Sequence, residues 1–302
     1  MADLNNVLTN IPNHYTTQFD ANWKHLVQQK NSRLREYVTL DSIQGKEKSY
    51  NQLDVASMTL ITNRSATTTI SDQAMAKRWI RPQQYDTAKL IDEWDEQLLG
   101  EVVLPTSPIV QSHGAAYART CDQVIINALG GTAYTGATGT TATALPAGQK
   151  VAANFVESGA AANSGLTIAK LRQAKFILDS NDVDEEEERI IVVSAKQLQD
   201  LLRTTEVTSG DYNTVRALVD GSLNTFMGFK FRRSQLLPLT VDIRSCYVYV
   251  KSGVVLAERG LKTHMDVRPD LSHSLQIRSV ASLAAVRLEE KKVVEIACDE
   301  VL

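Results

Sequence analysis

The chain has 302 residues, 32 of them Lys or Arg and 35 Asp or Glu, so its formal net charge is −3. Hydrophobic residues make up 43% and charged residues 22% of the chain, close to the averages of folded globular proteins, which excludes a disordered or collagen-like chain. The charge also excludes a dedicated nucleic-acid clamp, because tight phosphate binding requires a clear surplus of Lys and Arg.

The sequence shows no sign of a membrane-crossing or targeting segment. No apolar run approaches the ~18 residues that a transmembrane helix needs, and no basic residue precedes Lys24. Cys121, Cys246 and Cys298 lie far apart, without the paired spacing of a disulfide framework or a zinc site. We therefore expect a reducing, cytosolic setting, with no metal and no cofactor.

The N-terminal part combines a polar, Asn-rich stretch, residues 1–15, with a periodic one, residues 16–38. The helical spacing of the apolar side chains in the second stretch predicts an amphipathic helix. Two interpretations remain open: a helix on its own core, or an arm that docks on a neighbouring subunit. Its apolar residues are Phe19, Trp23, Leu26, Val27, Leu34 and Tyr37.

Residues 45–82 are polar and rich in β-formers, which predicts a long hairpin. Its tip is expected near residues 63–66, which include Arg64. The stretch 58–62 and the stretch 67–70 are expected to lie in its strands. Such a ribbon is marginal alone in water, so we expect it to lie against another surface, either as a flap on its own chain or on a second chain.

A short amphipathic element follows over residues 90–99, with Asp92, Glu93, Asp95 and Glu96 on its polar side. Dense carboxylates invite a metal or acid–base interpretation. Because no His or Cys lies close in sequence, a solvated face is favoured.

The clearest element is a long helix. Ser107 can cap it, Pro108 suits its first position, and Gly130 with Gly131 provides the left-handed stop, so we expect a helix over residues 108–129. Its apolar stripe predicts a spine lying on a sheet, and Cys121 on that stripe is read as a core residue rather than a nucleophile paired with His113. The stripe comprises Val110, Tyr117, Cys121, Val124, Ile125 and Ala128.

Residues 132–165 are rich in Gly, Ala, Thr and Ser and are expected to form a loop. The glycines at its start do not indicate a phosphate-binding loop, since they follow a helix and no Gly-Lys-Ser/Thr occurs in the chain.

The pattern then turns to alternating helices and strands. A helix from Leu166, a buried strand over residues 190–193, and a capping box of Ser194 and Gln197 that opens another helix are expected. A further helix is expected over residues 211–220, with strands over 228–231 and 241–250. The acidic run 182–188 lacks the central Gly of a calcium loop and is interpreted as a solvated turn.

The chain is expected to close in short strands. Residues 285–288 and 293–298 flank a charged turn and predict a hairpin. His264 and His273 lie near acidic residues in a grouping that can bind an ion, although surface histidines are the commoner case.

No catalytic motif accompanies these elements. Gly-x-Ser-x-Gly, His-Glu-x-x-His, Cys-x-x-Cys and the P-loop do not occur. The helical arm, the polar hairpin and the spine each lack a covering surface, and symmetric self-assembly supplies such surfaces.

Three phrases resemble a known family in their order and spacing. They are Arg78-Trp79-Ile80-Arg81 before Leu90-Ile91-Asp92, Tyr117 to Asp122 followed by Ile125 to Gly130, and Gly228-Phe229 with Ser234 and Leu237-Pro238. With the element order, they resemble the major capsid proteins of tailed bacteriophages, whose fold is shared with the herpesvirus capsid floor and the encapsulins.

The resemblance implies an α+β fold in five parts: an N-terminal arm (1–44), an extended β-hairpin loop (45–82), a peripheral domain with a spine helix (83–135), an axial α/β domain (136–264) and return strands (265–302). It implies a non-enzymatic subunit that forms hexamers and pentamers of an icosahedral shell around double-stranded DNA. Scaffolding, portal and decoration proteins are the expected partners, without a membrane. Assembly is expected in the host bacterial cytoplasm.

Certain residues are expected to shape or join the subunits. The apolar ones are Phe19 and Trp23, and the charged ones are Arg64, Arg78, Arg81, Asp92, Asp95, Arg119 and Asp122. Two alternatives stand beside this hypothesis: an encapsulin-like shell around an enzyme cargo, and a metal-assisted hydrolase that uses residues 92–96 with His113.

Overall fold

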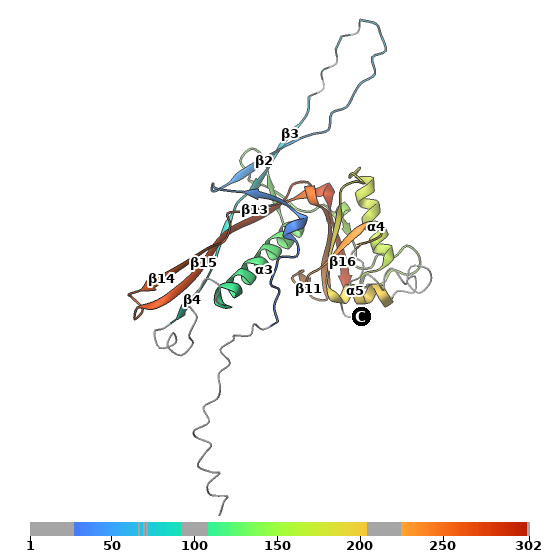
Figure 1. Ribbon diagram of the computed structural model, residues 1–302. Coiled ribbons are helices and arrows are strands. Elements are labelled where there is room, and N and C mark those ends of the chain that lie inside the picture. Colours follow the sequence, from blue (N-terminus) through green and yellow to red (C-terminus); the bar gives the residue numbers. More distant parts are fainter. Residues whose placement is uncertain are drawn as a thin grey trace, which may run out of the picture.

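The computed structural model describes residues 27–65, 67–68, 70, 72–91, 108–203 and 225–300. These residues form three sheets and three helices, so the expected α+β class is confirmed. In Figure 1 an arm of strands extends to one side, a lobe with two helices lies on the other, and the loop after β2 projects away from both. No helix among these residues has the length and hydropathy needed to cross a membrane.

The strands on one side of the molecule form a five-stranded sheet, the arm sheet, which is distinct from the N-terminal arm and is built around one long strand, β15. Strand β15 pairs antiparallel with β4 along one edge, and with β14 and then β13 along the other, while β1 pairs parallel with β13. Helix α3 packs along this sheet and occupies the centre of the molecule (Figure 1). The elements are β1 (Thr39–Ser42), β4 (Gln83–Ile91), β13 (Val254–Glu258), β14 (Lys262–Arg268), β15 (Ser274–Arg287) and α3 (Pro108–Gly130).

The lobe holds a seven-stranded sheet with helices α4 and α5. Its strand order is β7-β16-β12-β8-β10-β9, with β11 paired to β12. All five residues of β8 are buried, as expected for a central strand covered on both faces. The elements are α4 (Ile168–Ser180), α5 (Ala195–Arg203), β7 (Lys150–Val151), β8 (Arg189–Val193), β9 (Thr225–Phe226), β10 (Phe229–Arg233), β11 (Leu239–Thr240), β12 (Ile243–Val250) and β16 (Val293–Asp299).

A four-stranded sheet forms the base of the projecting loop, in the order β2-β3-β5-β6. Strands β2 and β3 pair from Lys48 with Ile80 to Leu53 with Met75. Its strands are β2 (Lys48–Leu53), β3 (Met75–Ile80), β5 (Ala133–Thr135) and β6 (Thr141–Thr143). The short 3-10 turns in the described residues are η2 (Arg35–Tyr37), η3 (Ala147–Gln149), η5 (Lys251–Gly253) and η6 (Glu290–Lys292).

The spine helix is confirmed, since α3 begins at Pro108 and ends at Gly130. Its buried face differs in part from the expected stripe: Cys121 and Ile125 are buried, but Ala118, Asp122 and Leu129 join them. These residues follow the i, i+3, i+4 spacing of one helix face. A carboxylate therefore lies within the buried face.

Several local expectations of the lobe are confirmed. Helix α4 begins after Thr167, whose side chain accepts a hydrogen bond from the backbone N–H of Lys170. The capping box is present, because Gln197 accepts a hydrogen bond from the backbone N–H of Ser194 at 3.2 Å. Strands β8, β10 and β12 lie where strands were expected, whereas the helix expected over 211–220 lies outside the described residues.

The helix expected over residues 16–38 is wrong for the residues that the structure describes there. From residue 27 onward the chain is irregular until η2, and β1 follows. Leu34 is nevertheless fully buried in the main core, as the apolar pattern indicated. The apolar pattern predicted that Leu34 is buried, but it did not predict the irregular backbone. Long-range hydrogen bonds with α3, described below, replace the hydrogen bonds of a helix there.

The loop expected over residues 132–165 contains three short strands, β5, β6 and β7. The buried ammonium of Lys170 helps to order its end, donating hydrogen bonds to the carbonyls of Ala153 (2.8 Å), Ser164 (2.6 Å) and Gly165 (3.0 Å). The hydrogen bond to Ala153, 17 residues away, and the pairing of β7 with β16 are non-local, so composition alone does not reveal them.

The two strands expected over residues 58–62 and 67–70 are also wrong, since pairing of β2 with β3 stops at Leu53 and Met75. One further backbone hydrogen bond, from Asp54 N–H to Ala74 O at 3.0 Å, closes the base of the loop. At the start of the 90–99 element, Leu90 and Ile91 belong to β4, and the rest of that element lies outside the described residues.

The closing hairpin is wrong as well. Strand β15 ends in the arm sheet and β16 lies in the lobe, where it pairs with β12 and β7. The charged turn η6 carries the chain from one sheet to the other. Spacing and turn composition identified β16 and the end of β15, but not the partners of either strand.

Candidate functional site

Arg78 anchors the base of the projecting loop to the crossing between the two large sheets. Its side chain is 4% exposed and donates hydrogen bonds to Leu288 O at 3.1 Å and to Glu290 Oε2 at 2.9 Å. A buried Arg–carboxylate pair fixes orientation, because removing either partner leaves an uncompensated charge. Arg78 was expected from the sequence to fix the loop, whereas Glu290 was missed because its turn reads as solvated.

Arg287 occupies the centre of the same region. Its fully buried guanidinium donates to the carbonyls of Leu129 at 2.7 Å and Gly131 at 3.0 Å, beside the C-terminus of α3. A cation suits this end of a helix, where carbonyls lack intrahelical partners. Burial lowers the pKa of Arg287 from its ordinary value. Loop base, spine helix and sheet crossing are thus joined by two arginines and Glu290.

A second contact set stiffens the sheet under the loop. Trp79 Nε1 donates to Gly136 O at 2.7 Å. Gly139 packs on the Trp79 ring at a φ of +67°, and a Cβ there would lie 2.6 Å from the ring. Arg81 lies over the Tyr134 ring at 5.5 Å and donates to Glu47 Oε1 at 3.1 Å. Arg81 is about half exposed, so its ion pair contributes little by itself.

Beyond this base, the loop exposes apolar side chains. Arg64, at the expected tip, forms no ion pair with any described residue. Large apolar residues exposed to this degree, in one segment, mark an interaction surface. The exposed set is Val55, Met58, Leu60, Ile61 and Ile70, together with Leu53 and Met75, the last pair of the base strands. Met58 and Leu60 are 103% and 88% exposed.

Asp122 fastens the N-terminal segment to the spine helix. Its carboxylate has no exposed surface and accepts hydrogen bonds from the backbone N–H of Arg33 at 3.0 Å and of Leu34 at 3.1 Å. Ser32 Oγ and Gln29 Nε2 donate to the same carboxylate. Asp122 was expected to pair with a cation, but its partners are backbone and neutral donors. Its position on the buried face of α3 was the sequence signal that could have indicated these partners.

Two further contacts hold this segment. Arg119 Nη1 donates to Gln28 Oε1 at 2.9 Å and to Gln29 O at 3.3 Å. Glu258 of β13 accepts hydrogen bonds from Arg35 Nε at 3.2 Å and from Tyr117 Oη at 2.8 Å. The Arg35 guanidinium lowers the pKa of Glu258 from its ordinary value.

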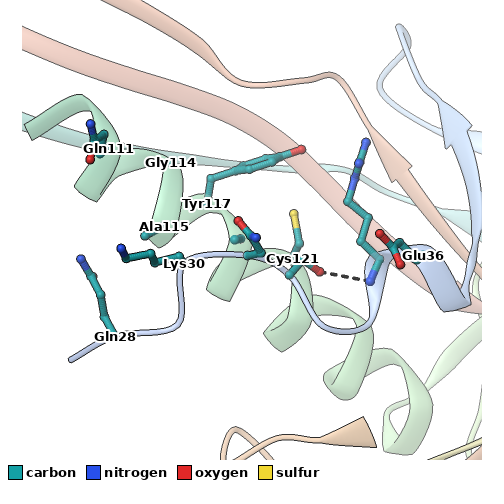
Figure 2. Close-up of a pocket in the computed structure, with 12 residues that line it drawn as sticks. Gln28, Lys30, Glu36, Gln111, Gly114, Ala115, Tyr117 and Cys121 are labelled. Carbon is teal, nitrogen blue, oxygen red and sulfur yellow. Dashed lines mark hydrogen bonds between the residues drawn. The ribbon is translucent and has the colours of Figure 1, made fainter. Parts of the chain in front are cut away.

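A groove of about 590 Å³ lies between this segment and α3. Figure 2 shows Gln28 and Lys30 on the segment opposite Gln111, Ala115 and Tyr117 of the helix. Its lining mixes amide, ammonium, guanidinium, carboxylate and small apolar groups, without an arrangement of nucleophile and base. This chemistry suits contact with another polypeptide or a polyanion better than catalysis.

Other expected residues separate from this region. Phe19, Trp23, Asp92 and Asp95 lie outside the described residues. His113 is buried against β15, with its Nδ1 3.1 Å from Ser279 Oγ, and burial lowers its pKa. Within the described part of the chain, no group of three or more His, Cys, Asp or Glu is placed to hold a metal ion.

Comparisons with known proteins agree with the resemblance. A family model described as phage capsid protein matches residues 11–300. A capsid structure of cyanophage P-SCSP1u is similar at 18% identity and a TM-score of 0.72, covering 96% of this chain and 94% of that one. The head of Helicobacter pylori bacteriophage KHP40 gives 11% identity, a TM-score of 0.71 and coverage of 96% and 97%. The cyanophage Pam1 capsid is similar at 12% identity and a TM-score of 0.69, covering 99% of both chains. A search of curated proteins gave no match.

Proposed function

The chain belongs to the phage capsid protein family and is a structural major capsid protein of the icosahedral head, and we propose that it acts as hexamers and pentamers joined by the projecting loop. Many copies of such a chain build the shell of the virion. The matching family is one of phage capsids, which favours this role over an encapsulin or a hydrolase.

The observation that carries the proposal is the contrast between the loop and its base. The base is held by the buried Arg78–Glu290 pair and by Trp79 on Gly139, whereas the loop exposes Met58, Leu60 and Ile61 almost completely. Exposed apolar surface of this kind is stabilised when a partner covers it. In a shell, the partner is the neighbouring copy, and the rigid base sets the direction in which the loop reaches it.

We extend the proposal to the other expected interface residues. Phe19 and Trp23 belong to an arm that continues the segment held by Asp122, and they contact a neighbouring subunit. Asp92, Asp95 and Arg64 are proposed to take part in contacts between subunits, Arg64 from the loop tip. The five-part domain division is part of the same proposal.

Assembly then arises from many weak contacts. An exposed ion pair contributes only ~0.2 to 1 kcal/mol, but repeated contacts around a closed shell act together through high effective concentration. The proposed contents are double-stranded DNA held without sequence preference. We propose assembly in the bacterial cytoplasm with scaffolding, portal and decoration proteins, and without enzymatic activity.

Replacing residues 54–74 by an Asn-Gly turn tests the proposal. Because Leu53 and Met75 are paired neighbours, the shortened chain keeps its base sheet and retains its fold. We expect a circular dichroism spectrum and a urea midpoint close to those of the full chain, but no closed particles in electron micrographs. Normal particles from the folded, shortened chain would overturn the role of the loop.

A further inference from the structure

Cationic side chains gather where the N-terminal segment meets α3 and β10. Arg33 Nη1 donates to the backbone carbonyl of Arg233 at 2.6 Å, which places the two arginines together. Arg232, next in β10, lies over the Tyr37 ring of η2 at 4.2 Å. Arg119 donates to the backbone carbonyl of Gln29, the residue before Lys30. We call this set the basic surface: Lys30, Arg33, Arg119, Arg232 and Arg233.

The basic surface lacks internal compensation. None of its five cations forms an ion pair with a described residue, and the Nε of Arg232 is buried without a hydrogen-bond acceptor. Lys30, Arg33 and Arg233 are exposed. Like charges gathered on one surface repel one another, and a bound anion relieves that repulsion.

Three carboxylates near it are already engaged. Asp122 is fully buried and bound to backbone N–H groups. Glu258 pairs with Arg35, and Glu188 pairs with Lys230. Glu36 is the exposed carboxylate of the segment. On a chain with a net charge of −3, this local surplus of positive charge indicates a polyanionic partner.

The polar character of the surface selects among polyanions. Between Lys30 and Arg33 the chain places Asn31 and Ser32, and Gln28 lies beside them. An acidic protein would be bound mainly through apolar and aromatic anchors, whereas phosphates are bound by Lys, Arg and polar side chains.

We propose that the basic surface contacts the phosphates of duplex DNA, and that the face formed by the N-terminal segment, α3 and β10 is therefore the inner face of the shell. This inference rests on the proposed function. Each copy contacts only a few phosphates, so binding per copy is weak and independent of sequence, and the duplex can slide.

The double variant R33Q/R233Q tests the contact. Both side chains are exposed, and the hydrogen bond from Arg33 N–H to Asp122 is retained. Binding of a fluorescent duplex of about 20 base pairs by the purified, unassembled chain is measured between about 50 and about 200 mM salt. Loss of two phosphate contacts reduces the slope of log K against log salt concentration by about 2. Between these two salt concentrations, the affinity of the variant therefore falls by roughly tenfold less than that of the unmodified chain.

The control K262Q/K291Q removes two exposed charges elsewhere, on β14 and η6, and is expected to bind as the unmodified chain does. Equal binding and equal salt slopes of R33Q/R233Q and the unmodified chain would overturn the proposal. Binding of a Glu-rich peptide in place of the duplex would also overturn it and indicate an acidic protein partner. Electron micrographs of the same variants separate the two questions, because particles that form without duplex binding leave the shell function intact.

Discussion

The buried carboxylate of Asp122 accepts a hydrogen bond at 3.1 Å from the backbone N–H of Leu34, a residue 88 positions earlier in the chain. Leu34 is itself fully buried in the core. One helix residue thus determines both the path of the N-terminal segment and the burial of its apolar side chain. In a shell subunit, this contact fixes the point at which the N-terminal arm leaves the rest of the subunit.

Substituting Asp122 by Ala is expected to destabilise the chain by about 3 kcal/mol or more, because hydrogen bonds to charged groups contribute about 1.5–3 kcal/mol each and the buried N–H donors lose their acceptor. Urea denaturation measures the change. Asn127→Ala, at an exposed position of the same helix, is the control, and a change within about 0.5 kcal/mol is expected there. Equal effects of the two substitutions would contradict the assigned role of Asp122.

The Arg78–Glu290 pair is expected to show strong coupling. Side-chain exposures are 4% and 19%, and loss of one partner of a buried pair costs about 3–5 kcal/mol. A double-mutant cycle with R78M and E290Q, read by urea denaturation, measures the coupling. The half-exposed Arg81–Glu47 pair is the matched control, with an expected coupling below about 1 kcal/mol. Coupling no larger at Arg78 than at Arg81 would exclude it as the anchor of the loop.

Leu60→Ser with Ile61→Ser is expected to reduce particle formation without changing stability. Both side chains are almost fully exposed in the described chain, so the free subunit loses no packing, whereas a covering neighbour loses apolar contact. Particle yield by sedimentation and the urea midpoint are measured together. Val241→Ser, at another exposed apolar position, is the control. An unchanged yield from the double variant would show that Leu60 and Ile61 do not lie in an interface.

His113 gives an expected pH dependence. Burial lowers its pKa below the unfolded value of 6.5, so the neutral form is favoured in the folded chain. Its contribution is complete above pH 6.5 and is lost as the pH falls from there through the lowered pKa, because the unfolded chain takes up the proton first. Subtracting the stability of His113→Gln from that of the unmodified chain at several pH values isolates this term. A difference that stays flat below pH 6.5 would contradict it.

Local signals in the sequence were sufficient where structure is set locally. Pro108 and Gly130 delimit α3, and Ser194 with Gln197 opens α5, because caps and stops act through neighbouring backbone groups. The partners of strands were not predictable in this way. The pattern identified β16 and the end of β15, but it did not reveal that they belong to different sheets. Arg287 contacts the end of α3 at the crossing between those sheets.

The candidate site was predictable in part for the same reason. Arg78 and Arg119 were identified as structural cations. Arg78 pairs with Glu290, whereas Arg119 donates to neutral groups of the N-terminal segment. Glu290 was missed because a charged turn looks solvated until the fold buries it. Asp122 was identified, but its partners were not, since backbone N–H groups carry no sequence signature.

The most direct test of the account is electron microscopy of the purified full-length chain, combined with small-angle scattering over a concentration series. We expect closed particles of uniform diameter, or discrete rings that give way to such particles as the concentration rises. A chain that remains a solitary monomer at every concentration, with the 54–74 segment folded onto its own body, would contradict it.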